Sequence, residues 1–147
     1  MNEQQKMSPV DEQAVRSAGR IYHDWDVALG ARDVEAAAAL YAPDCVLESP
    51  LVRHLLTSER GVVEGREKLR EFLRVVFERT PPARQRYREG FFTDGRKLIW
   101  EYPRAKPDGE QMDFVEVMEI EDGLIRRHCV YWGWYGVKIL QEDRYHP

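Results

Sequence analysis

The sequence has little cysteine and histidine, and neither residue type is spaced for metal binding or redox chemistry. Its 147 residues include two cysteines, Cys45 and Cys129, which lie far apart and form no C-x-x-C pair. The four histidines show no H-x-x-x-H spacing. These absences argue against a zinc site and against a catalytic dithiol. We therefore expect two reduced thiols, no metal and no cofactor.

Long apolar runs and an excess of positive charge are also missing. No stretch approaches the roughly 20 apolar residues of a transmembrane helix, and the polar N-terminus lacks a signal-peptide pattern. The net charge of −4 gives no electrostatic reason to bind nucleic acid or an anionic membrane. We expect a cytoplasmic protein with neither of these partners.

What is present is a series of helical patterns followed by strand patterns. We expect a disordered leader over residues 1–7, one domain over residues 8–140 and a tail over residues 141–147. Helices are predicted, from the spacing of apolar residues and from capping signals, over residues 8–29, 34–41 and 66–79. Gly30 is expected to end the first of them.

Strand patterns dominate the remainder. A short strand is predicted over residues 45–49, followed by an irregular segment over 51–64. The predicted meander consists of residues 84–92, 97–105, 111–120 and 124–137, with turns at Asp94-Gly95 and at residues 106–109. Helices gathered on one face of an antiparallel sheet define the α+β class.

The last predicted hairpin places a glutamate beside a histidine. The loop Glu121-Asp122-Gly123 fits a three-residue turn, which would put Glu116 directly opposite His128. Directly opposed side chains have Cβ atoms about 4.5–5.5 Å apart. Phe114, Met118, Val130 and Trp132 surround the pair on this face, so it could act as a general acid and base in an apolar setting. The alternative is a structural pair in which the glutamate only satisfies the histidine.

The opposite face of this hairpin is apolar as well. It carries Val115, Val117, Cys129, Tyr131 and Tyr135, whereas an exposed antiparallel sheet normally alternates apolar with polar residues. Another surface is therefore expected to cover this face. A second copy of the same sheet is the simplest candidate, which predicts a homodimer.

Four strings, in this order and at these spacings, carry a family resemblance. They are ALGARD (28–33), LYAPDCVLESP (40–50), GRE (65–67) and EIEDGLI (119–125). The chain resembles the NTF2-like superfamily, which has the cystatin-like fold, and specifically its SnoaL-like and ketosteroid-isomerase-like branches. The resemblance implies a cone formed by a curved sheet, with helices closing its wide end around a pocket, usually in a homodimer.

The same resemblance suggests positions for functional residues. Trp25 and Glu116 fall where the isomerases carry their oxyanion hydrogen-bond donors, and Ser49 falls at the position of their base. SnoaL-like cyclases are similar at His128, while Val130 occupies the position of their acid/base aspartate. The polar groups of these enzymes are therefore only partly present.

The sequence thus predicts a pocket for a small, largely apolar carbonyl, enol or epoxide-type molecule, with Glu116 and His128 as the catalytic pair. The residues expected to line this pocket are Trp25, Ser49, Trp100, Tyr102, Phe114, Met118, Val130 and Trp132. The reaction would be of the isomerase, cyclase, dehydratase or hydrolase type. Two alternatives stay open: a ligand-binding module without catalysis, and a dimerisation domain whose own aromatic residues fill the cavity.

Overall fold

The α+β class is confirmed by a computed structural model, which describes residues 9–56, 58–81, 89–102 and 113–146. Its helices are α1 (Glu12–Gly30), α2 (Val34–Ala38), α3 (Pro50–Leu56), α4 (Arg66–Arg79) and α5 (Trp134–Gln141). Its strands are β1 (Tyr41–Glu48), β2 (Val62–Glu64), β3 (Phe92–Thr93), β4 (Lys97–Tyr102), β5 (Phe114–Glu121) and β6 (Leu124–Trp132). No helix among the described residues has both the length and the apolar character needed to cross a membrane.

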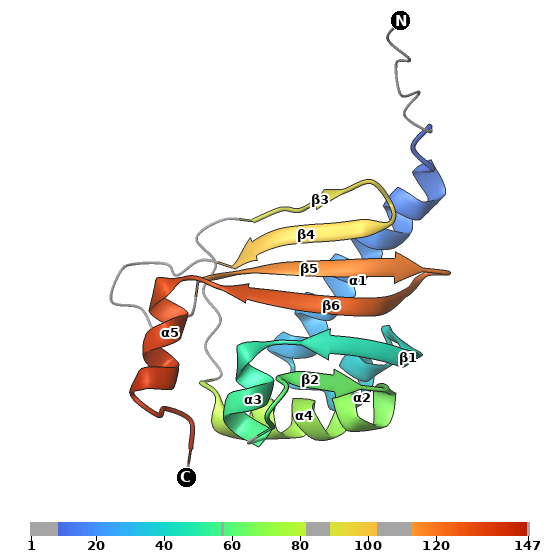
Figure 1. Ribbon diagram of the computed structural model, residues 1–147. Helices are drawn as coiled ribbons and strands as arrows, with labels where there is room; N and C mark the ends of the chain where they lie inside the picture. The colour runs from blue at the N-terminus through green and yellow to red at the C-terminus, as the bar shows by residue number, and fades with distance from the viewer. Residues whose placement is uncertain (1–8, 57, 82–88, 103–112, 147) are drawn as a thin grey trace, which may run out of the picture.

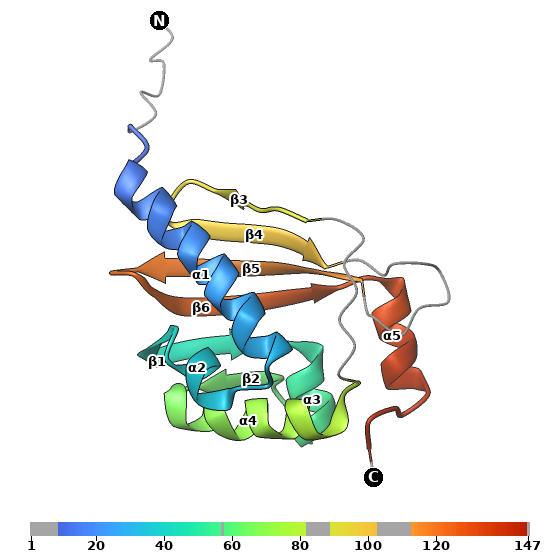
Figure 2. The ribbon, with the colours of Figure 1, turned by 180° about the vertical axis from the view of Figure 1, so that it is seen from behind.

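The six strands form one curved, unclosed sheet in the order β2-β1-β6-β5-β4-β3. Neighbouring strands are antiparallel, except that β1 and β6 pair in parallel. Helix α1 crosses one face of this sheet (Figure 2), whereas no described helix covers most of the opposite face of β4, β5 and β6 (Figure 1). The core, and with it any enclosed site, therefore lies between α1, α4 and the inner face of the sheet.

Helix α1 is held by its cap and by one apolar stripe. The Asp11 carboxylate accepts hydrogen bonds from the backbone N–H groups of Gln13 and Ala14, which satisfies two donors that have no partner inside the helix. The prediction that the helix starts at residue 8 is therefore wrong, because this cap sets the start at Glu12. The stripe that faces the sheet consists of Ala18, Ile21, Trp25 and Ala28.

Helix α1 ends in a turn whose left-handed residue is an arginine. Asp33 N–H donates to the carbonyl of Ala28 (2.9 Å), and Arg32 N–H donates to that of Leu29 (3.1 Å). This pair of bonds defines a Schellman motif, in which the residue after the cap adopts a left-handed conformation and is usually glycine. Arg32 occupies that position with φ +54°. The helix does end at Gly30, as predicted, but the left-handed residue is Arg32.

Several predicted boundaries are corrected by the structure. The predicted helix over residues 34–41 stops at Ala38, and the chain enters β1 at Tyr41. The segment predicted to be irregular contains α3 and β2, because Pro50 suits a first helical turn. The predicted strand over residues 124–137 ends at Trp132, and α5 follows after Gly133. Helix α4 was predicted with its observed bounds.

Other predictions fall partly or wholly outside the described residues. These are the leader (1–7), the first part of the strand over 84–92, the end of the strand over 97–105 and the turn at 106–109. Within the described part, the Asp94-Gly95 turn connects β3 to β4, and the Asp94 side chain accepts from the backbone N–H groups of Arg96 and Lys97.

The register of the β5–β6 hairpin differs from the predicted one. Asp122 (φ +52°) and Gly123 (φ +75°) form a two-residue turn with both residues left-handed, so Glu121 pairs with Leu124. A bulge in β6 then shifts the register by one further residue. Glu116 is consequently opposite Val130, and the predicted direct opposition of Glu116 and His128 is wrong. The total shift is two residues, which keeps every side chain beyond the bulge on its predicted face.

The outer face of this hairpin is apolar and partly exposed. Val115, Val117 and Cys129 are half-buried, and 60% of Tyr131 is exposed. Tyr135, expected on the same face, lies instead on α5. The homodimer predicted from this face stays a prediction.

Candidate functional site

The hairpin brings Glu116 and His128 together diagonally, on the inner face of the sheet. Diagonal cross-strand neighbours are about 7–8 Å apart at their backbones, which long side chains can bridge. His128 Nε2 bonds to Glu116 Oε2. The two residues are only 2% and 3% exposed, respectively. Because a buried charge is costly without a partner, this bond is what allows a carboxylate to lie within the core.

Tyr41, at the start of β1, extends this pair into a network. Its hydroxyl lies 2.8 Å from His128 Nδ1 and accepts a hydrogen bond from Trp25 Nε1 at 3.4 Å. The parallel pairing of β1 with β6 places Tyr41 opposite Ile125 in the sheet. Trp25 lies on α1, the helix that crosses this face of the sheet. Burial raises the pKa of the Tyr41 phenol, which therefore keeps its proton.

The donors and acceptors of the network assign the tautomer of His128. The indole N–H of Trp25 can only donate, so the hydroxyl of Tyr41 accepts from it. The phenolic proton then needs an acceptor, and His128 Nδ1 is the one within reach. With Nδ1 accepting, the proton of a neutral imidazole is on Nε2, which donates to the Glu116 carboxylate. Tyr41 thus fixes both the orientation and the tautomer of His128.

This network lines a cavity of about 180 Å³. Five of the residues predicted to line a pocket do so: Trp25, Ser49, Phe114, Val130 and Trp132. Glu116, His128 and Tyr41 line it too, and helix α4 closes it with Phe72, Leu73, Val76 and Phe77. Within the described part of the chain, His128 is the only residue bonded to Glu116, and it uses Oε2. Glu116 Oε1 therefore remains available to a ligand.

Two of the predicted lining residues are absent from the described cavity lining, and the side chain of a third lies outside the described residues. Met118 is fully buried and Trp100 is 1% exposed; neither belongs to the described lining. Trp100 instead packs edge-on against Trp25 and Tyr22, with ring centroids 5.2 and 5.3 Å away. Both residues are therefore part of the buried core and not of the cavity surface. Tyr102 ends β4, and its side chain is outside the described residues.

Ser49 has a structural role at the cavity edge. Its hydroxyl accepts from the backbone N–H of Leu51 (3.2 Å), at the start of α3. Its own backbone N–H donates to the carbonyl of Gly61 (3.0 Å). The side chain therefore shapes the turn into α3, and no described base lies against it to activate a nucleophile.

Two further lining residues, Arg32 and Tyr145, were not predicted from the sequence. Arg32 reaches the cavity from the end of α1, and Tyr145 reaches it from the C-terminal segment. Tyr145 has φ +69°, an unusual conformation for a bulky residue. Neither position follows a helix or strand periodicity, which is why the pattern of apolar residues could not indicate them.

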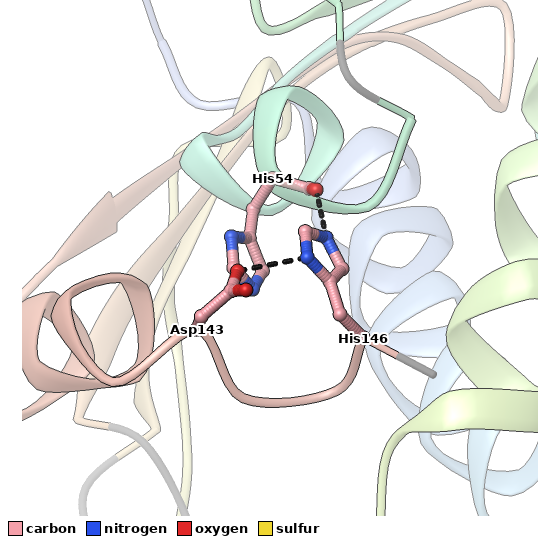
Figure 3. Close-up of side chains that lie close together, drawn as sticks. All are labelled: His54, Asp143 and His146. Carbon is pink, nitrogen blue, oxygen red and sulfur yellow. Dashed lines mark hydrogen bonds and ion pairs between the residues drawn. The ribbon is translucent and has the colours of Figure 1, made fainter.

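A cluster of His54, Asp143 and His146 holds the C-terminal segment against α3 (Figure 3). His54 Nε2 donates to the carbonyl of Arg144 (2.6 Å), and His146 Nε2 donates to the carbonyl of His54 (2.5 Å). His146 Nδ1 lies 2.8 Å from Asp143 Oδ1. We call these three residues the C-terminal clasp. By holding residues 143–146 in place, the clasp positions Tyr145 at the cavity.

The clasp has the ligand types of a metal site but the wrong geometry for one. Its potential ligand atoms lie within 4.8 Å of one another. However, both ring nitrogens of His146 already have partners, the carbonyl of His54 and the carboxylate of Asp143. The two imidazole rings also stack, with centroids 4.2 Å apart and planes 12° from parallel. Histidine lone pairs lie in the ring plane, so two stacked rings cannot share an ion at about 2.0–2.1 Å without turning.

A second, open groove of about 680 Å³ lies beside α3 and the outer face of β6. Its lining includes Arg53, Glu59, Arg60, Cys129 and Tyr131. Most of these polar groups face solvent, and the groove contains no buried pair comparable to Glu116 and His128 among the described residues. The cavity lined by Glu116 and His128 is therefore the stronger candidate site.

Comparisons with known proteins agree with this architecture. Residues 21–128 match the family model of the SnoaL-like domain, whereas no curated protein sequence matches the chain. A SnoaL-like protein of unknown function from Burkholderia thailandensis E264 has a similar structure, with 18% identity, a TM-score of 0.63 and coverage of 86% of this chain and 99% of that one.

Two similar structures are associated with small molecules. SalBIII is described as an epoxide hydrolase/cyclase-like enzyme in pyran ring formation in the polyether salinomycin. It is 18% identical to this chain with a TM-score of 0.59, and the match covers 86% of this chain and 96% of that one. TerC, co-crystallised with polyporic acid, is 18% identical with a TM-score of 0.64, covering 86% of this chain and 98% of that one. At 18% sequence identity, the structural similarity shows only that these proteins share the fold.

Proposed function

The chain belongs to the SnoaL-like branch of the NTF2-like superfamily, and from this premise we propose that it is a cofactor-independent enzyme acting on a small, largely apolar molecule by general acid/base chemistry. The observation that carries the proposal is the buried Glu116–His128–Tyr41 network at the wall of a cavity of about 180 Å³. Its reaction would be of the isomerase, cyclase, dehydratase or hydrolase type.

Glu116 is the group that exchanges a proton with the substrate in this proposal. Its Oε1 is available in the described structure, whereas its Oε2 is held by His128. A carboxylate in an apolar cavity can accept a proton from a carbon or hydroxyl group and return it at another position. His128 donates to Oε2 throughout and so stabilises the anionic form, while Tyr41 keeps His128 in the required tautomer.

The remaining walls support this chemistry by placing apolar side chains around the network. Phe72, Phe77, Phe114 and Trp132 contribute apolar surface around the polar network. In such surroundings electrostatic interactions are stronger than in water, so a proton transfer at Glu116 is more sensitive to its hydrogen-bond partners. The association of SalBIII with pyran ring formation and of TerC with polyporic acid supports the idea that this fold accommodates organic molecules.

The test is a comparison of Glu116→Gln with the parent protein. A panel of small apolar carbonyl, enol and epoxide compounds is first screened for binding and turnover. Glu116→Gln keeps the size of the side chain but cannot exchange a proton, so we expect retained binding and loss of most turnover, on the order of 100-fold or more. Glu119→Gln, an exposed substitution on the same strand, is the matched control and should behave like the parent.

Unchanged turnover in Glu116→Gln would remove this residue from any acid/base role and refute the mechanism. If compounds bind but none is converted by the parent, and Glu116→Gln binds them equally or more tightly, the protein is a ligand-binding module. This alternative is favoured by the positions of Ser49 and Val130, which lack the acid/base groups that the isomerases and cyclases carry there.

A further inference from the structure

Arg32 occupies a backbone position that favours glycine. It is the left-handed residue of the Schellman motif that ends α1, with φ +54°, and glycine adopts this conformation without the steric cost of a Cβ. The same position directs the side chain away from the helix and to the cavity, which Arg32 lines. A residue that the local backbone disfavours therefore reaches the candidate site.

The guanidinium of Arg32 is held firmly by uncharged groups. Its Nη1 donates to the carbonyl of Phe77, and its Nη2 donates to that of Thr80 (3.0 Å). Its Cζ also lies 5.9 Å from the centre of the Phe77 ring. These carbonyls are at the negative end of α4, where a cation is favourable. No carboxylate of the described residues pairs with Arg32, so its charge is fixed in place but is not neutralised by an acid.

Arg32 is also the only lysine or arginine among the described residues of the cavity lining. A guanidinium has five N–H donors, and two of its nitrogens are engaged with the carbonyls, which leaves donor capacity for a ligand. Glu116, the one carboxylate among the described lining residues, lies on the sheet and is bonded to His128. The cavity therefore presents a cation from the helical side and an acid from the sheet side.

Building on the function proposed above, we propose that the ligand of this cavity is a small apolar molecule with a terminal carboxylate, which binds to Arg32. Arginine forms strong, charge-assisted hydrogen bonds with carboxylates. Glu116 repels the same anion, so the two residues together set the orientation of the ligand. Its carboxylate lies at Arg32, and its apolar body extends toward Glu116, where the proton transfer takes place.

The test uses two probes of the same shape, 3-phenylpropanoate and 3-phenylpropanamide, which differ in charge. Their affinities for the full-length protein are measured by isothermal titration calorimetry at neutral pH and low salt. We expect the carboxylate to bind roughly 10- to 100-fold more tightly than the amide, which is the range for a hydrogen bond to a charged group.

Variants at position 32 assign this preference to the guanidinium. Arg32→Gly removes the side chain and supplies the residue that the left-handed backbone favours, so the fold should be retained. We expect it to lose the preference for the carboxylate, which should then bind no more tightly than the amide. Arg32→Lys keeps the charge and should retain part of the preference. Arg16→Gln, on the exposed surface of α1 where Arg16 contacts Gln13, changes the net charge by the same amount as Arg32→Gly and should keep the full preference.

Equal binding of the two probes by the parent, or a preference that survives in Arg32→Gly, would overturn this inference and leave the cavity intact as a site for neutral ligands. If neither probe nor any compound of the screening panel binds the parent, the proposed function fails, and the inference fails with it. Circular dichroism of each variant confirms that the comparison is between folded proteins.

Discussion

Replacing Tyr41 by phenylalanine removes one oxygen atom from the centre of the buried network. The ring volume is unchanged, so no cavity forms, but His128 Nδ1 loses the hydroxyl that lies 2.8 Å away. Leaving one buried polar group unsatisfied costs about 1–3 kcal/mol. We expect a value in the upper half of this range, because the hydroxyl also accepts from Trp25 Nε1. The free energy of unfolding should fall accordingly.

The same substitution should change how stability depends on alkaline pH. In the folded protein burial raises the pKa of Tyr41 above its ordinary value, which is about 10. Above pH 10 the unfolded chain therefore loses a proton that the folded protein retains. Stability contributed by a group with a raised pKa is complete below the unfolded pKa and is lost as the pH rises. The loss is about 1.4 kcal/mol per pH unit, and Tyr41→Phe lacks it.

Equilibrium urea unfolding, followed by tryptophan fluorescence at pH 7 and between about pH 10 and 11, measures both effects. Tyr131→Phe is the control, because Tyr131 is 60% exposed and its substitution should change stability by less than about 0.5 kcal/mol. The stability gap between the parent and Tyr41→Phe should be clear at pH 7 and should narrow above pH 10. A gap no larger than that of the control would refute the network and with it the tautomer assigned to His128.

Two further outcomes are expected at the edges of the molecule. We expect the chain to form a homodimer through the outer face of β5 and β6. Val117→Asp places a charge on this half-buried face and should therefore lower the mass measured by light scattering toward that of a monomer. A parent protein that is already monomeric would contradict this expectation. His146→Ala should release the C-terminal clasp and accelerate amide hydrogen exchange over residues 143–146, while the exposed His23→Ala leaves it unchanged. Equal exchange in the two variants would show that other contacts hold this segment.

The part of the fold that depends on local patterns could be predicted from the sequence. Helix α4 has an apolar stripe and clear stops, so both its ends were found. Glu116 and His128 were placed on one face because side chains alternate along a strand, and this parity survives a register error of two residues. The direct opposition failed for two reasons: the conformations of Asp122 and Gly123 exclude Glu121 from the turn, and a bulge in β6 adds a second shift of one residue.

Features that depend on contacts between distant segments could not be predicted. Tyr41 meets His128 only because β1 pairs in parallel with β6, and no local signal indicates that pairing. Strand alternation placed Met118 on the inner face, and Trp100 was expected among the aromatic pocket residues, but neither inference could show how far the side chain lies from the cavity. The role of Arg32 follows from a left-handed helix end that resembles an ordinary loop in the sequence.

The parallel pairing of β1 and β6 also sets the order in which this protein can be completed during synthesis. Strand β1 leaves the ribosome early, yet it has only the short β2 as a partner until the last strand of the sheet has emerged. Such long-range pairings form slowly because a large loop must close first. Trp25 and Tyr41 are therefore made long before the imidazole that they position. A fragment that ends before β6 would have neither the centre of the sheet nor its polar network, so the maturation of the fold and of the candidate site is a single late event.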